Sequence, residues 1–361
     1  MSRVLWLRER FGWMGSHSGY DPVCDAIARQ RAGSYESVWL RADRRLPPGT
    51  GPLFGRLRRM ARGSPFYNEH SARAELATAW RARRLRPDLV HLTYAENQLG
   101  LLARLRDRVP GRLVGTVHQP PGWYRLRYPR PQILAALDAV IVLGSREARF
   151  FEELAPGRVH FVPYGVDVDF FRPAPPGDPA PEGPPRVLFG GRWLRDFRTL
   201  IRVVDRVLDR HPSVRFDLLV PRDARRDPEL LGLARHERVS WHERLPDDAL
   251  VDLYRRADLL LLPMLDCVGN SVLVEALACG LPVVSSDVGA MRDYTREAFA
   301  DLLPVGDVEG LAGAVLRLLG DPDERARRGA AARAFAEARL AWPEIAAATL
   351  AVYDGVLKRD G

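Results

Sequence analysis

The sequence predicts an α/β protein made of two doubly wound domains, each built on a parallel sheet. The chain has 361 residues, too many for one ordinary core and about right for two domains that share a cleft. Short apolar runs alternate with helical periodicity in both halves, as crossover helices on a parallel sheet require. Between the halves, residues 172–185 contain seven prolines, which excludes a helix or interior strand and indicates a linker.

The first half repeats a unit of strand, loop and helix. Val4–Leu7 is a short apolar run, followed by the loop GWMGSHSG and a helical pattern over residues 21–31. Further strands are predicted at 88–92, 113–117 and 139–143, with helical patterns at 99–106 and from Ser145 onward. We expect a first domain over residues 1–172 and a linker at 173–185.

The same alternation restarts after the linker. Helical periodicity separates apolar runs at 186–189, 214–220, 239–241, 259–262 and 282–285. These runs predict a second domain over residues 186–340. An amphipathic stretch at 342–357 follows the last unit, and we expect residues 341–361 to form a helix that packs back towards the first domain.

Charge and composition restrict the partners of the protein. With 46% hydrophobic and 28% charged residues the chain has the composition of a globular protein, and the excess behind its net charge of +8 lies in the first half. Arginines cluster there at 56–62, 81–86 and 125–130. Such clusters suit an anionic acceptor or a membrane surface, and equally an ordinary solvated face. We expect no nucleic-acid partner.

The sequence offers no membrane span and excludes some chemistry. Its longest apolar stretch, Leu259–Leu265, is interrupted by Pro263, and its beginning lacks the features of a signal peptide. We therefore expect a cytoplasmic protein, with peripheral membrane contact through the basic half as an open alternative. The only lysine is Lys358, which excludes a P-loop and Schiff-base catalysis. The three cysteines show no paired spacing, so free thiols are expected.

Ligands of open α/β sheets bind beside the carboxyl ends of the strands, so the loops after strands are the places to search. The segment GGRWLRDFRTL, residues 190–200, directly follows a predicted strand. Gly191 lets the backbone approach a ligand, and Arg192, Arg195 and Arg198 offer planar donors suited to phosphate oxygens. The segment therefore predicts a diphosphate site.

A second loop leads into a helix. Gly269, Asn270 and Ser271 form a cap ahead of an apolar-periodic segment, and the amides of Asn270, Ser271 and Val272 would receive a phosphate there. Glu275 lies one turn inside this helix, on the face of Ser271. It could reach the hydroxyl pair of a ribose, and an ordinary solvated carboxylate is the other interpretation.

Loops of the first half offer further candidates. Tyr94, Glu96 and Asn97 follow the predicted strand at 88–92 and are candidates for contact with an acceptor. His17 lies in the first loop, where contact with a ligand and surface solvation are equally compatible with the sequence.

The order of these segments resembles the family 4 retaining glycosyltransferases, which have the GT-B fold. The strongest segment is EALACGLPVVSSDVG at 275–289, similar to the family's signature around its ribose-binding glutamate. Supporting segments are RVHFVPYGVDVDFFRP at 158–173, PDLVHL at 87–92 and VGTVHQPPG at 114–122. The resemblance implies two Rossmann-like domains with parallel sheets facing across a cleft, the first on the acceptor side and the second binding a nucleotide sugar.

The resemblance also implies roles for individual residues. Glu275 would hold the ribose, Arg192 and a following arginine the diphosphate, and His118 the donor sugar. The glycines of the first loop resemble the family's glycine-rich turn near the donor phosphates. The implied catalytic residues are His118, Arg192, Arg198 and Glu275, and the implied donor-binding residues are Gly15, Gly191, Arg195, Asn270, Ser271 and Val272.

The sequence departs from the family pattern at three places, of which the pair Gly289 and Ala290, where the family has two glycines, is the mildest. The family pairs two glutamates as E-x7-E; Glu275 matches the second, whereas Cys267 stands at the first, beside Asp266. The usual lysine of the phosphate loop is absent, so Arg195 or Arg198 must take its place.

The reaction implied by the resemblance is hexosyl transfer with retention, from a UDP- or GDP-sugar to an unidentified small-molecule, lipid-linked or glycan acceptor. Arginines and helix amides would stabilise the departing diphosphate, so no metal or other cofactor is expected. Asp167-x-Asp169 lies inside a segment that matches the family and is interpreted as structural. A nucleotide-sugar epimerase or hydrolase and a non-catalytic nucleotide-sugar-binding protein remain as alternatives, while the absence of G-x-G-x-x-G argues against a dinucleotide-dependent oxidoreductase.

Overall fold

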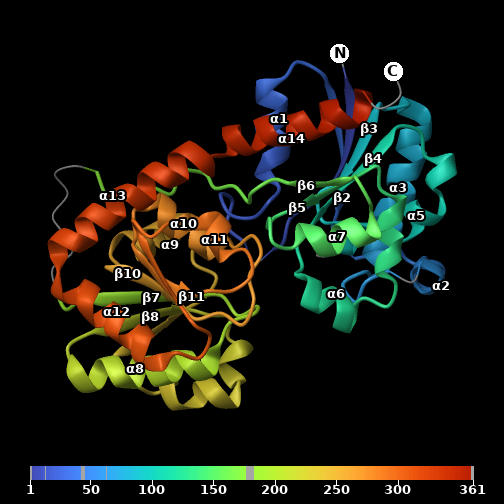
Figure 1. Cartoon of the computed structure of the whole chain (residues 1–361). Coiled ribbons are helices and arrows are strands. Elements are labelled where there is room, and N and C mark those ends of the chain that lie inside the picture. Colours follow the sequence, from blue (N-terminus) through green and yellow to red (C-terminus); the bar gives the residue numbers. More distant parts are fainter. Residues whose placement is uncertain (1, 13, 42–44, 62, 176–182, 359–361) are drawn as a thin grey trace. The chain divides into compact units, whose positions relative to one another are not determined.

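The computed structural model describes residues 2–12, 14–41, 45–61, 63–175 and 183–358 (Figure 1). Contacts between residues divide the chain into two compact units. Unit 1 comprises residues 1–12, 19–163 and 342–361, and unit 2 comprises residues 13–18 and 164–341. The segment 164–172, expected in the first domain, thus belongs to unit 2, as does the short loop 13–18. Most of the expected linker, residues 176–182, lies outside the described residues.

Unit 1 is built on a six-stranded sheet of parallel strands in the order β2-β1-β3-β4-β5-β6. Both β3 and β5 are buried along their whole length, which agrees with their nearly continuous apolar sequences and with a sheet covered on both faces. The strands are β1 (Arg3–Glu9), β2 (Ser34–Leu40), β3 (Leu89–Leu92), β4 (Arg112–Val117), β5 (Ala139–Val142) and β6 (Val159–Phe161).

Helices of unit 1 include the last helix of the chain, which packs along the first (Figure 1). Between these two helices, Gln30 Nε2 donates to the carbonyl oxygen of Pro343 at 2.6 Å, and the guanidinium of Arg31 pairs with Asp354 at 2.7 Å. The α-helices are α1 (Pro22–Gln30), α2 (Gly51–Ala61), α3 (Glu69–Leu85), α4 (Ala95–Gln98), α5 (Leu101–Arg104), α6 (Pro121–Arg127), α7 (Ala148–Leu154) and α14 (Trp342–Leu357); the 3-10 turns are η1 (Arg106–Arg108) and η2 (Pro131–Ala136).

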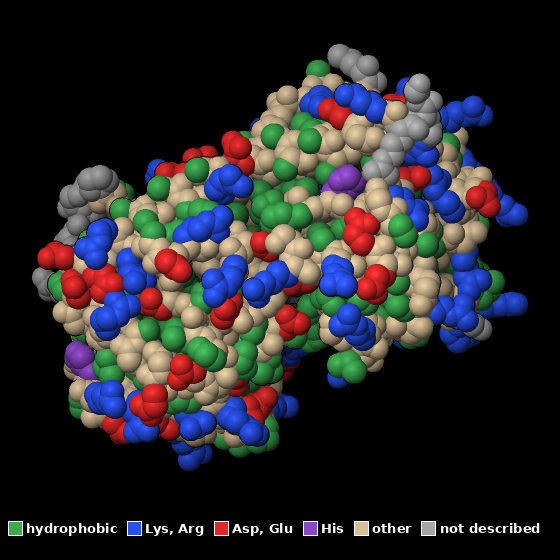
Figure 2. Space-filling model, viewed as in Figure 1, with side chains coloured by type: hydrophobic (Ala, Val, Ile, Leu, Met, Phe, Trp, Pro, Cys, Tyr) green, Lys and Arg blue, Asp and Glu red, His purple; other side chains and the backbone are tan. Residues whose placement is uncertain are grey.

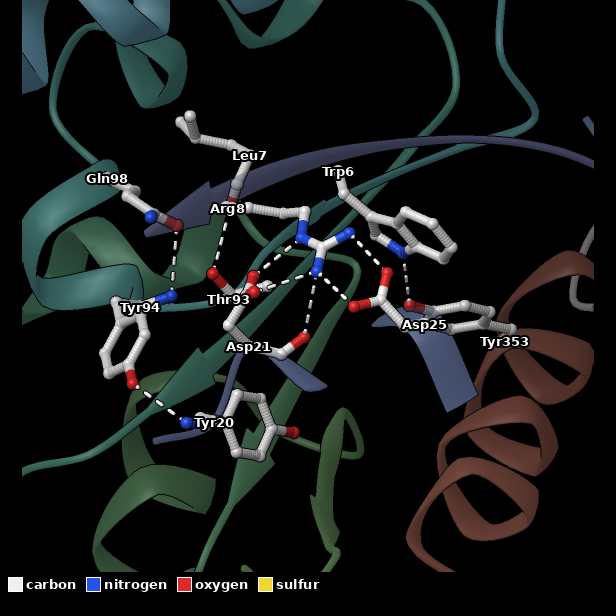
Figure 3. A network of polar contacts seen from close by, with 10 residues as sticks. All are labelled: Trp6, Leu7, Arg8, Tyr20, Asp21, Asp25, Thr93, Tyr94, Gln98 and Tyr353. Carbon is white, nitrogen blue, oxygen red and sulfur yellow. Dashed lines mark hydrogen bonds and ion pairs between the residues drawn. The ribbon is translucent and has the colours of Figure 1, made fainter. Parts of the chain in front are cut away.

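A buried ion network fixes α1 against β1 (Figure 3). The Arg8 guanidinium donates to Asp21 through Nε at 2.6 Å and Nη2 at 2.8 Å, and to Asp25 through Nη1 at 2.8 Å. Burial alone would lower the pKa of Arg8, but its hydrogen bonds to the two aspartates raise that pKa above its ordinary value. The Arg8 side chain also lies 4.6 Å from the ring centroid of Trp39 on β2. This network therefore joins one helix and two strands inside unit 1.

Unit 2 repeats the architecture with a second six-stranded parallel sheet, in the order β12-β11-β10-β7-β8-β9. Its strands are β7 (Arg186–Gly190), β8 (Arg215–Leu219), β9 (Val239–His242), β10 (Leu259–Leu262), β11 (Val283–Ser286) and β12 (Ala300–Leu303). Its helices are α8 (Phe197–Arg210), α9 (Asp247–Arg255), α10 (Ser271–Ala278), α11 (Met291–Tyr294), α12 (Val308–Gly320) and α13 (Pro322–Arg339), with 3-10 turns η3 (Ala224–Arg226) and η4 (Pro228–Leu233).

Helix α10 lies against α13 at a point where two glycines meet. A Cβ atom added at Gly329 would overlap the carbonyl oxygen of Gly280, so this approach tolerates no side chain. Arg333 stands one turn further along α13, and its Nη1 donates to the carbonyl oxygens of Val168, Phe171 and Ala278. These contacts set the position of the helix that supports the end of α10.

Three strands escape the sequence-based prediction, and all three lie at sheet edges. β2, β6 and β12 each have a covered neighbour on one side only, so their residues are partly exposed and the apolar run is broken. Of the helix predicted over residues 99–106, only Leu101–Arg104 forms an α-helix, as α5. Glu75 accepts the backbone N–H groups of Gly100, Leu101 and Leu102, and this side-chain cap starts a new short helix, α5, after α4 has ended.

On the surface, basic side chains are interspersed with acidic ones over the face shown in Figure 2. No helix among those the structure describes is long and apolar enough to span a bilayer.

Candidate functional site

The candidate site in unit 2 lies where two neighbouring parallel strands end. β7 pairs with β10, so the loop after β7 and the loop after β10 leave the sheet at the same edge. Arg195 on the first loop donates from Nη2 to Oδ1 of Asn270 on the second at 3.3 Å. The structure thus brings together two segments that the sequence singled out separately.

Arg195 is the centre of this contact. Its side chain is only 9% exposed, and its Nε donates to the carbonyl oxygen of Gly190 at 2.7 Å, while Nη1 donates to that of Trp193 at 2.9 Å. Among the described residues no carboxylate pairs with it, and burial lowers its pKa to about 10. A buried cation with only neutral partners has a high desolvation cost and attracts an anion.

The backbone of this loop is shaped around the arginine. Gly191 has φ of +85°, and a Cβ there would lie 2.6 Å from Nη2 of Arg195, so only glycine fits. Leu194 has φ of +59°, a left-handed conformation that is unfavourable for a leucine. Such strain in a loop beside a buried charge is typical of ligand-binding sites.

The start of α10 faces the same loop. Asn270 is the cap: its Oδ1 accepts the N–H of Leu273 at 3.3 Å. A Cβ at Gly190 would lie 2.9 Å from Cγ1 of Val272, which shows how closely β7 approaches this helix. Within the described residues, the N–H groups of Ser271 and Val272 make no hydrogen bond, as expected for the first turn of a helix open to an anion.

Arg192 and Arg198 are placed differently from Arg195. Both are exposed, with 53% and 78% of their side chains accessible, and each is paired with a carboxylate. Arg192 pairs with Asp223 and Arg198 with Glu229, at 3.1 Å in the latter case. The structure therefore distinguishes one buried guanidinium from two surface ion pairs among the three predicted arginines.

Glu275 is buried inside α10 rather than solvated. Its Oε2 accepts the hydroxyl of Tyr254 on α9, and its Oε1 accepts that of Ser18, both at 2.7 Å. Burial raises the pKa of Glu275 to about 7, against the lowering effect of these two hydrogen bonds; the charge of Asp247 raises it further. Tyr254 was not predicted, because an apolar face of an amphipathic helix gives no sign that a hydroxyl on it holds a carboxylate.

The loop 13–18 belongs to unit 2 through contacts with three carboxylates, and its residue 13 lies outside the described part. The backbone N–H of Ser16 donates to Asp247 at 3.0 Å, and a Cβ at Gly15 would overlap the same carboxylate unless the Asp247 side chain moved. His17 Nδ1 lies 2.7 Å from Asp167 Oδ2. The predicted donor-binding Gly15 therefore lies against Asp247, a residue that the sequence did not single out.

Asp167 is one half of the Asp-x-Asp pair. Its Oδ1 accepts the backbone N–H groups of Asp169 and Phe170, at 3.2 and 3.1 Å, which makes a local turn. Within the described ranges no group of three or more His, Cys, Asp or Glu side chains is arranged to hold a metal.

Cys267 occupies the position of the family's first glutamate and is buried. Its Sγ donates to the carbonyl oxygen of Val268 at 3.0 Å, so the thiol is turned into its own loop. The neighbouring Asp266 is half-buried, and its Oδ1 accepts the N–H of Cys267 at 2.8 Å. Burial raises the pKa of Asp266, although this hydrogen bond lowers it.

His118 lies in unit 1, directly after β4. Its Nε2 lies 2.8 Å from the carbonyl oxygen of Thr93, so that nitrogen carries the proton, and its ring stacks on Tyr94 with centroids 4.2 Å apart. Burial lowers the pKa of His118 to about 4, which leaves the imidazole neutral at physiological pH.

Two families match the chain in succession. Residues 25–170 match the family described as Glycosyltransferase Family 4, and residues 184–321 match the one described as Glycosyl transferases group 1. A D-inositol 3-phosphate glycosyltransferase from Xylanimonas cellulosilytica is 33% identical over 313 residues, covering 75% of this chain and 73% of that protein. One of the same name from Nocardia farcinica is 32% identical over 304 residues, covering 75% and 67%.

Solved structures of low sequence identity share the fold. The sucrose-phosphate synthase of Thermosynechococcus elongatus has a TM-score of 0.75 and 21% identity, covering 99% of both chains. Anabaena Alr3699/HepE in complex with UDP and glucose has a TM-score of 0.67 and 16% identity, covering 97% of this chain and 100% of that one. The predicted fold class and the predicted family are thereby confirmed. On this identity and coverage, the chain belongs to the family 4 glycosyltransferases, with the two parallel sheets of the GT-B fold.

Proposed function

We propose that the chain moves a hexosyl group from a UDP- or GDP-sugar to a hydroxyl of an acceptor, with retention at the anomeric carbon and without a metal. The observation that carries the proposal is the Arg195 guanidinium, which is buried with only neutral partners beside the first turn of α10. A diphosphate would supply the negative charge that this site lacks.

The leaving group of the reaction is a nucleoside diphosphate. When the bond between the anomeric carbon and the diphosphate oxygen breaks, its electron pair passes to that oxygen, and Arg195 with the N–H groups of Ser271 and Val272 would stabilise the charge. These groups are fixed in place before the reaction, so they need no reorganisation. In this proposal Arg195 takes the place of the family's lysine, whereas Arg192 and Arg198 reach a ligand only by leaving their surface carboxylates.

Glu275 would hold the ribose. The hydrogen bond that Ser18 donates to Oε1 has the form that a ribose hydroxyl would make with the same oxygen. Tyr254 fixes the other oxygen, Oε2, from α9. A ribose would therefore meet a carboxylate that is already oriented.

The relatives suggest the first acceptor to test. Two of them bear the name D-inositol 3-phosphate glycosyltransferase, and this ligand combines hydroxyl groups with a phosphate. The arginine clusters of unit 1 suit such an anion. HepE, whose complex holds UDP and glucose, likewise makes UDP-glucose a natural first donor.

Two further residues concern the contact with the donor sugar: His118 of unit 1, and Cys267, which stands where the family has its first glutamate. His118 would contact the donor sugar as a neutral hydrogen-bonding group, since its pKa of about 4 excludes a cation. The contact that the family makes through its first glutamate is missing at Cys267, so Asp266 is the carboxylate available there. A non-catalytic nucleotide-sugar-binding protein is the alternative that Cys267 favours.

A donor panel tests the proposal. UDP-, GDP- and ADP-glucose are added in EDTA, and thermal stabilisation and release of the nucleotide are measured with and without D-inositol 3-phosphate. We expect one base to stabilise the protein and the acceptor to accelerate nucleotide release. Binding without any turnover would select the non-catalytic alternative, and activity that returns only with Mg²⁺ would overturn metal independence.

We also propose that unit 1 contacts anionic membranes peripherally. On α2, Leu53 and Met60 are 55% and 51% exposed beside the exposed Arg56 and Arg59, a combination typical of surface-bound helices. Sedimentation with vesicles of phosphatidylglycerol, compared with phosphatidylcholine, tests this. Loss of vesicle binding in Leu53→Ser/Met60→Ser would support the proposal. It would be contradicted if the wild-type protein sedimented with neither kind of vesicle, or equally with both.

A further inference from the structure

Among the described residues of unit 1 four glutamates are buried, Glu9, Glu75, Glu96 and Glu147, and the first three differ in how many donors their carboxylates accept. Glu75 accepts four donors: the hydroxyl of Tyr67 and the backbone N–H groups of Gly100, Leu101 and Leu102. A carboxylate offers about four acceptor sites, so Glu75 is saturated. Its role is to cap α5.

Glu96 accepts three donors from the protein, all through one oxygen. Its Oε1 accepts the N–H of His118 at 2.6 Å, the N–H of Gln119 at 2.9 Å and the hydroxyl of Tyr124 at 2.9 Å. This carboxylate fixes the loop after β4. The sequence made it a candidate for acceptor contact, whereas its donors assign it to the support of His118.

Of these three, Glu9 accepts the fewest donors. It is 4% exposed, yet among the described residues only Asn97 donates to it, from Nδ2 to Oε2 at 2.8 Å. No described arginine or lysine pairs with it, and the neighbouring Arg8 is engaged by Asp21 and Asp25 (Figure 3). The other oxygen of Glu9 accepts no donor from the described residues and is not among the fully enclosed atoms that lack a partner, so it is open to a donor from outside the protein.

The place of Glu9 in the fold indicates what the partner is. Glu9 is the last residue of β1 and lies in register with Leu40, the last residue of β2, at the carboxyl edge of the sheet where ligands of such folds bind. Asn97 stands in α4, just after β3, at the same edge. Burial raises the pKa of Glu9 to about 7; the Asn97 hydrogen bond lowers it, and the charge of Glu96 raises it. A buried group perturbed in this way at a ligand-binding edge is a functional candidate.

The side chains of Glu9 and Asn97 favour a ligand with uncharged hydrogen-bond donors. One carboxylate and one amide oxygen are too few ligands for a metal, and within the described residues no third ligand of that kind joins them. The arginine surplus of the first half disfavours a cationic ligand. Hydroxyl groups remain, because a carboxylate accepts them and the adjacent amide can accept or donate to a neighbouring one.

We propose that Glu9, oriented by Asn97, binds hydroxyl groups of a polyhydroxylated acceptor at the carboxyl edge of the unit 1 sheet. The inference rests on the proposed function, since it assigns the acceptor subsite of that reaction. Glu9 acts in binding and orientation, and the bond-forming hydroxyl need not be the one that it holds. The acceptor class is therefore a polyol, with or without a phosphate.

The test separates donor from acceptor. The variants Glu9→Gln and Asn97→Ala are compared with wild type and with the control Glu36→Gln, which changes a partly exposed glutamate paired with Arg81 in the same unit. Each protein is assayed for donor hydrolysis and for transfer to D-inositol 3-phosphate, myo-inositol and fructose 6-phosphate. We expect Glu9→Gln to keep the donor Kd and the rate of donor hydrolysis, and to raise the acceptor KM about 10-fold or more, in line with the loss of a charged hydrogen bond. Glu9→Asp should recover part of the effect, which a purely structural role would not produce.

Each outcome decides a different claim. Unchanged acceptor KM in Glu9→Gln overturns the inference and leaves the proposed function standing. A panel in which no polyol accelerates nucleotide release while hydrolysis continues also overturns the inference, and favours the hydrolase alternative. Absence of both donor binding and hydrolysis in wild type overturns the proposed function, and the inference falls with it.

Discussion

The guanidinium of Arg195 and the side-chain amide of Asn270 lie 3.3 Å apart, and through this contact the loop after β7 meets the cap of α10. The same Asn270 oxygen also accepts the N–H of Leu273. The Asn270 side chain therefore caps α10 and also contacts the buried guanidinium. A substitution in the loop after β7 or at the start of α10 should alter the geometry of the candidate site.

Replacing Arg195 by methionine should abolish donor binding with little loss of stability. The substitution removes a buried charge that has no carboxylate partner, so the cost of its lost hydrogen bonds is offset by relief of desolvation. We expect the affinity for UDP-glucose to fall at least about 100-fold, as for a charged contact of about 3 kcal/mol, while Tm shifts by only a few degrees.

Calorimetric titration and thermal unfolding measure the two effects. Arg206→Met is the matched control, since Arg206 forms a surface ion pair with Glu309 on the same unit. If donor affinity survived in the Arg195 variant, the buried guanidinium would have a structural role only.

The stability of the protein should depend on Glu275 between about pH 5 and 8. The pKa of this carboxyl is raised from 4.5 to about 7 in the folded state, so the folded chain retains the proton more strongly than the unfolded one. The associated stability is fully present below about pH 4.5 and is lost as the pH rises through about 7. Glu275→Gln should therefore gain on wild type by about 2–3 kcal/mol between pH 5 and 8.

Urea unfolding at several pH values measures that difference. The exposed Glu309 provides the control variant Glu309→Gln, for which we expect no such trend. A difference between wild type and Glu275→Gln that stays constant with pH would contradict a raised pKa.

Gly329→Ala should destabilise the protein by about 1–3 kcal/mol, because the new Cβ would overlap the carbonyl oxygen of Gly280 and force α13 away from α10. Gly313→Ala is the matched control in α12: nothing lies within 4 Å of its new Cβ, and alanine favours a helix by up to about 1 kcal/mol. Chemical denaturation of both variants gives the comparison. Equal changes in the free energy of unfolding for the two variants would show that α13 can move away from Gly280 without loss of stability.

Asp21→Asn should cost about 3 kcal/mol, since it leaves the buried Arg8 with Asp25 alone. Asp354→Asn breaks a more exposed ion pair, to Arg31, and should cost less than about 1 kcal/mol. The ratio of the two losses in denaturant unfolding checks the assignment of the Arg8 network to the core of unit 1.

The sequence predicted the interior of both sheets well and their margins poorly. Runs such as LLLL in β10 are buried on both faces and are recognisable without a structure, whereas β2 mixes polar and apolar residues because it is an edge. The break between α4 and α5 depends on Glu75, a residue far away in the chain whose carboxylate replaces helical hydrogen bonds. Local patterns contain no sign of such long-range caps.

For the candidate site, the segments were predictable and the state of each side chain was not. Motif order located Arg195, Asn270 and Glu275, but only tertiary packing shows that Arg195 is buried while Arg192 stays in a surface ion pair. Glu9 has one sequence signal of its own: it is an acidic residue two positions after the apolar run Val4–Leu7, where a strand ends at a ligand-binding edge. The roles of these residues stay predictions until the variants are measured.

The pairing of α14 with α1 affects how the chain folds as it is synthesised. Tyr353 of α14 accepts from the indole of Trp6 on β1, and its hydroxyl also lies 2.6 Å from Nδ1 of His91 on β3. Trp6 and His91 can make these contacts only after α14 has been synthesised, and α14 follows all of residues 164–341. Until residues 342–357 have been synthesised, Trp6 and His91 lack these contacts, and the nascent chain depends on chaperones for protection of this part of the sheet from aggregation.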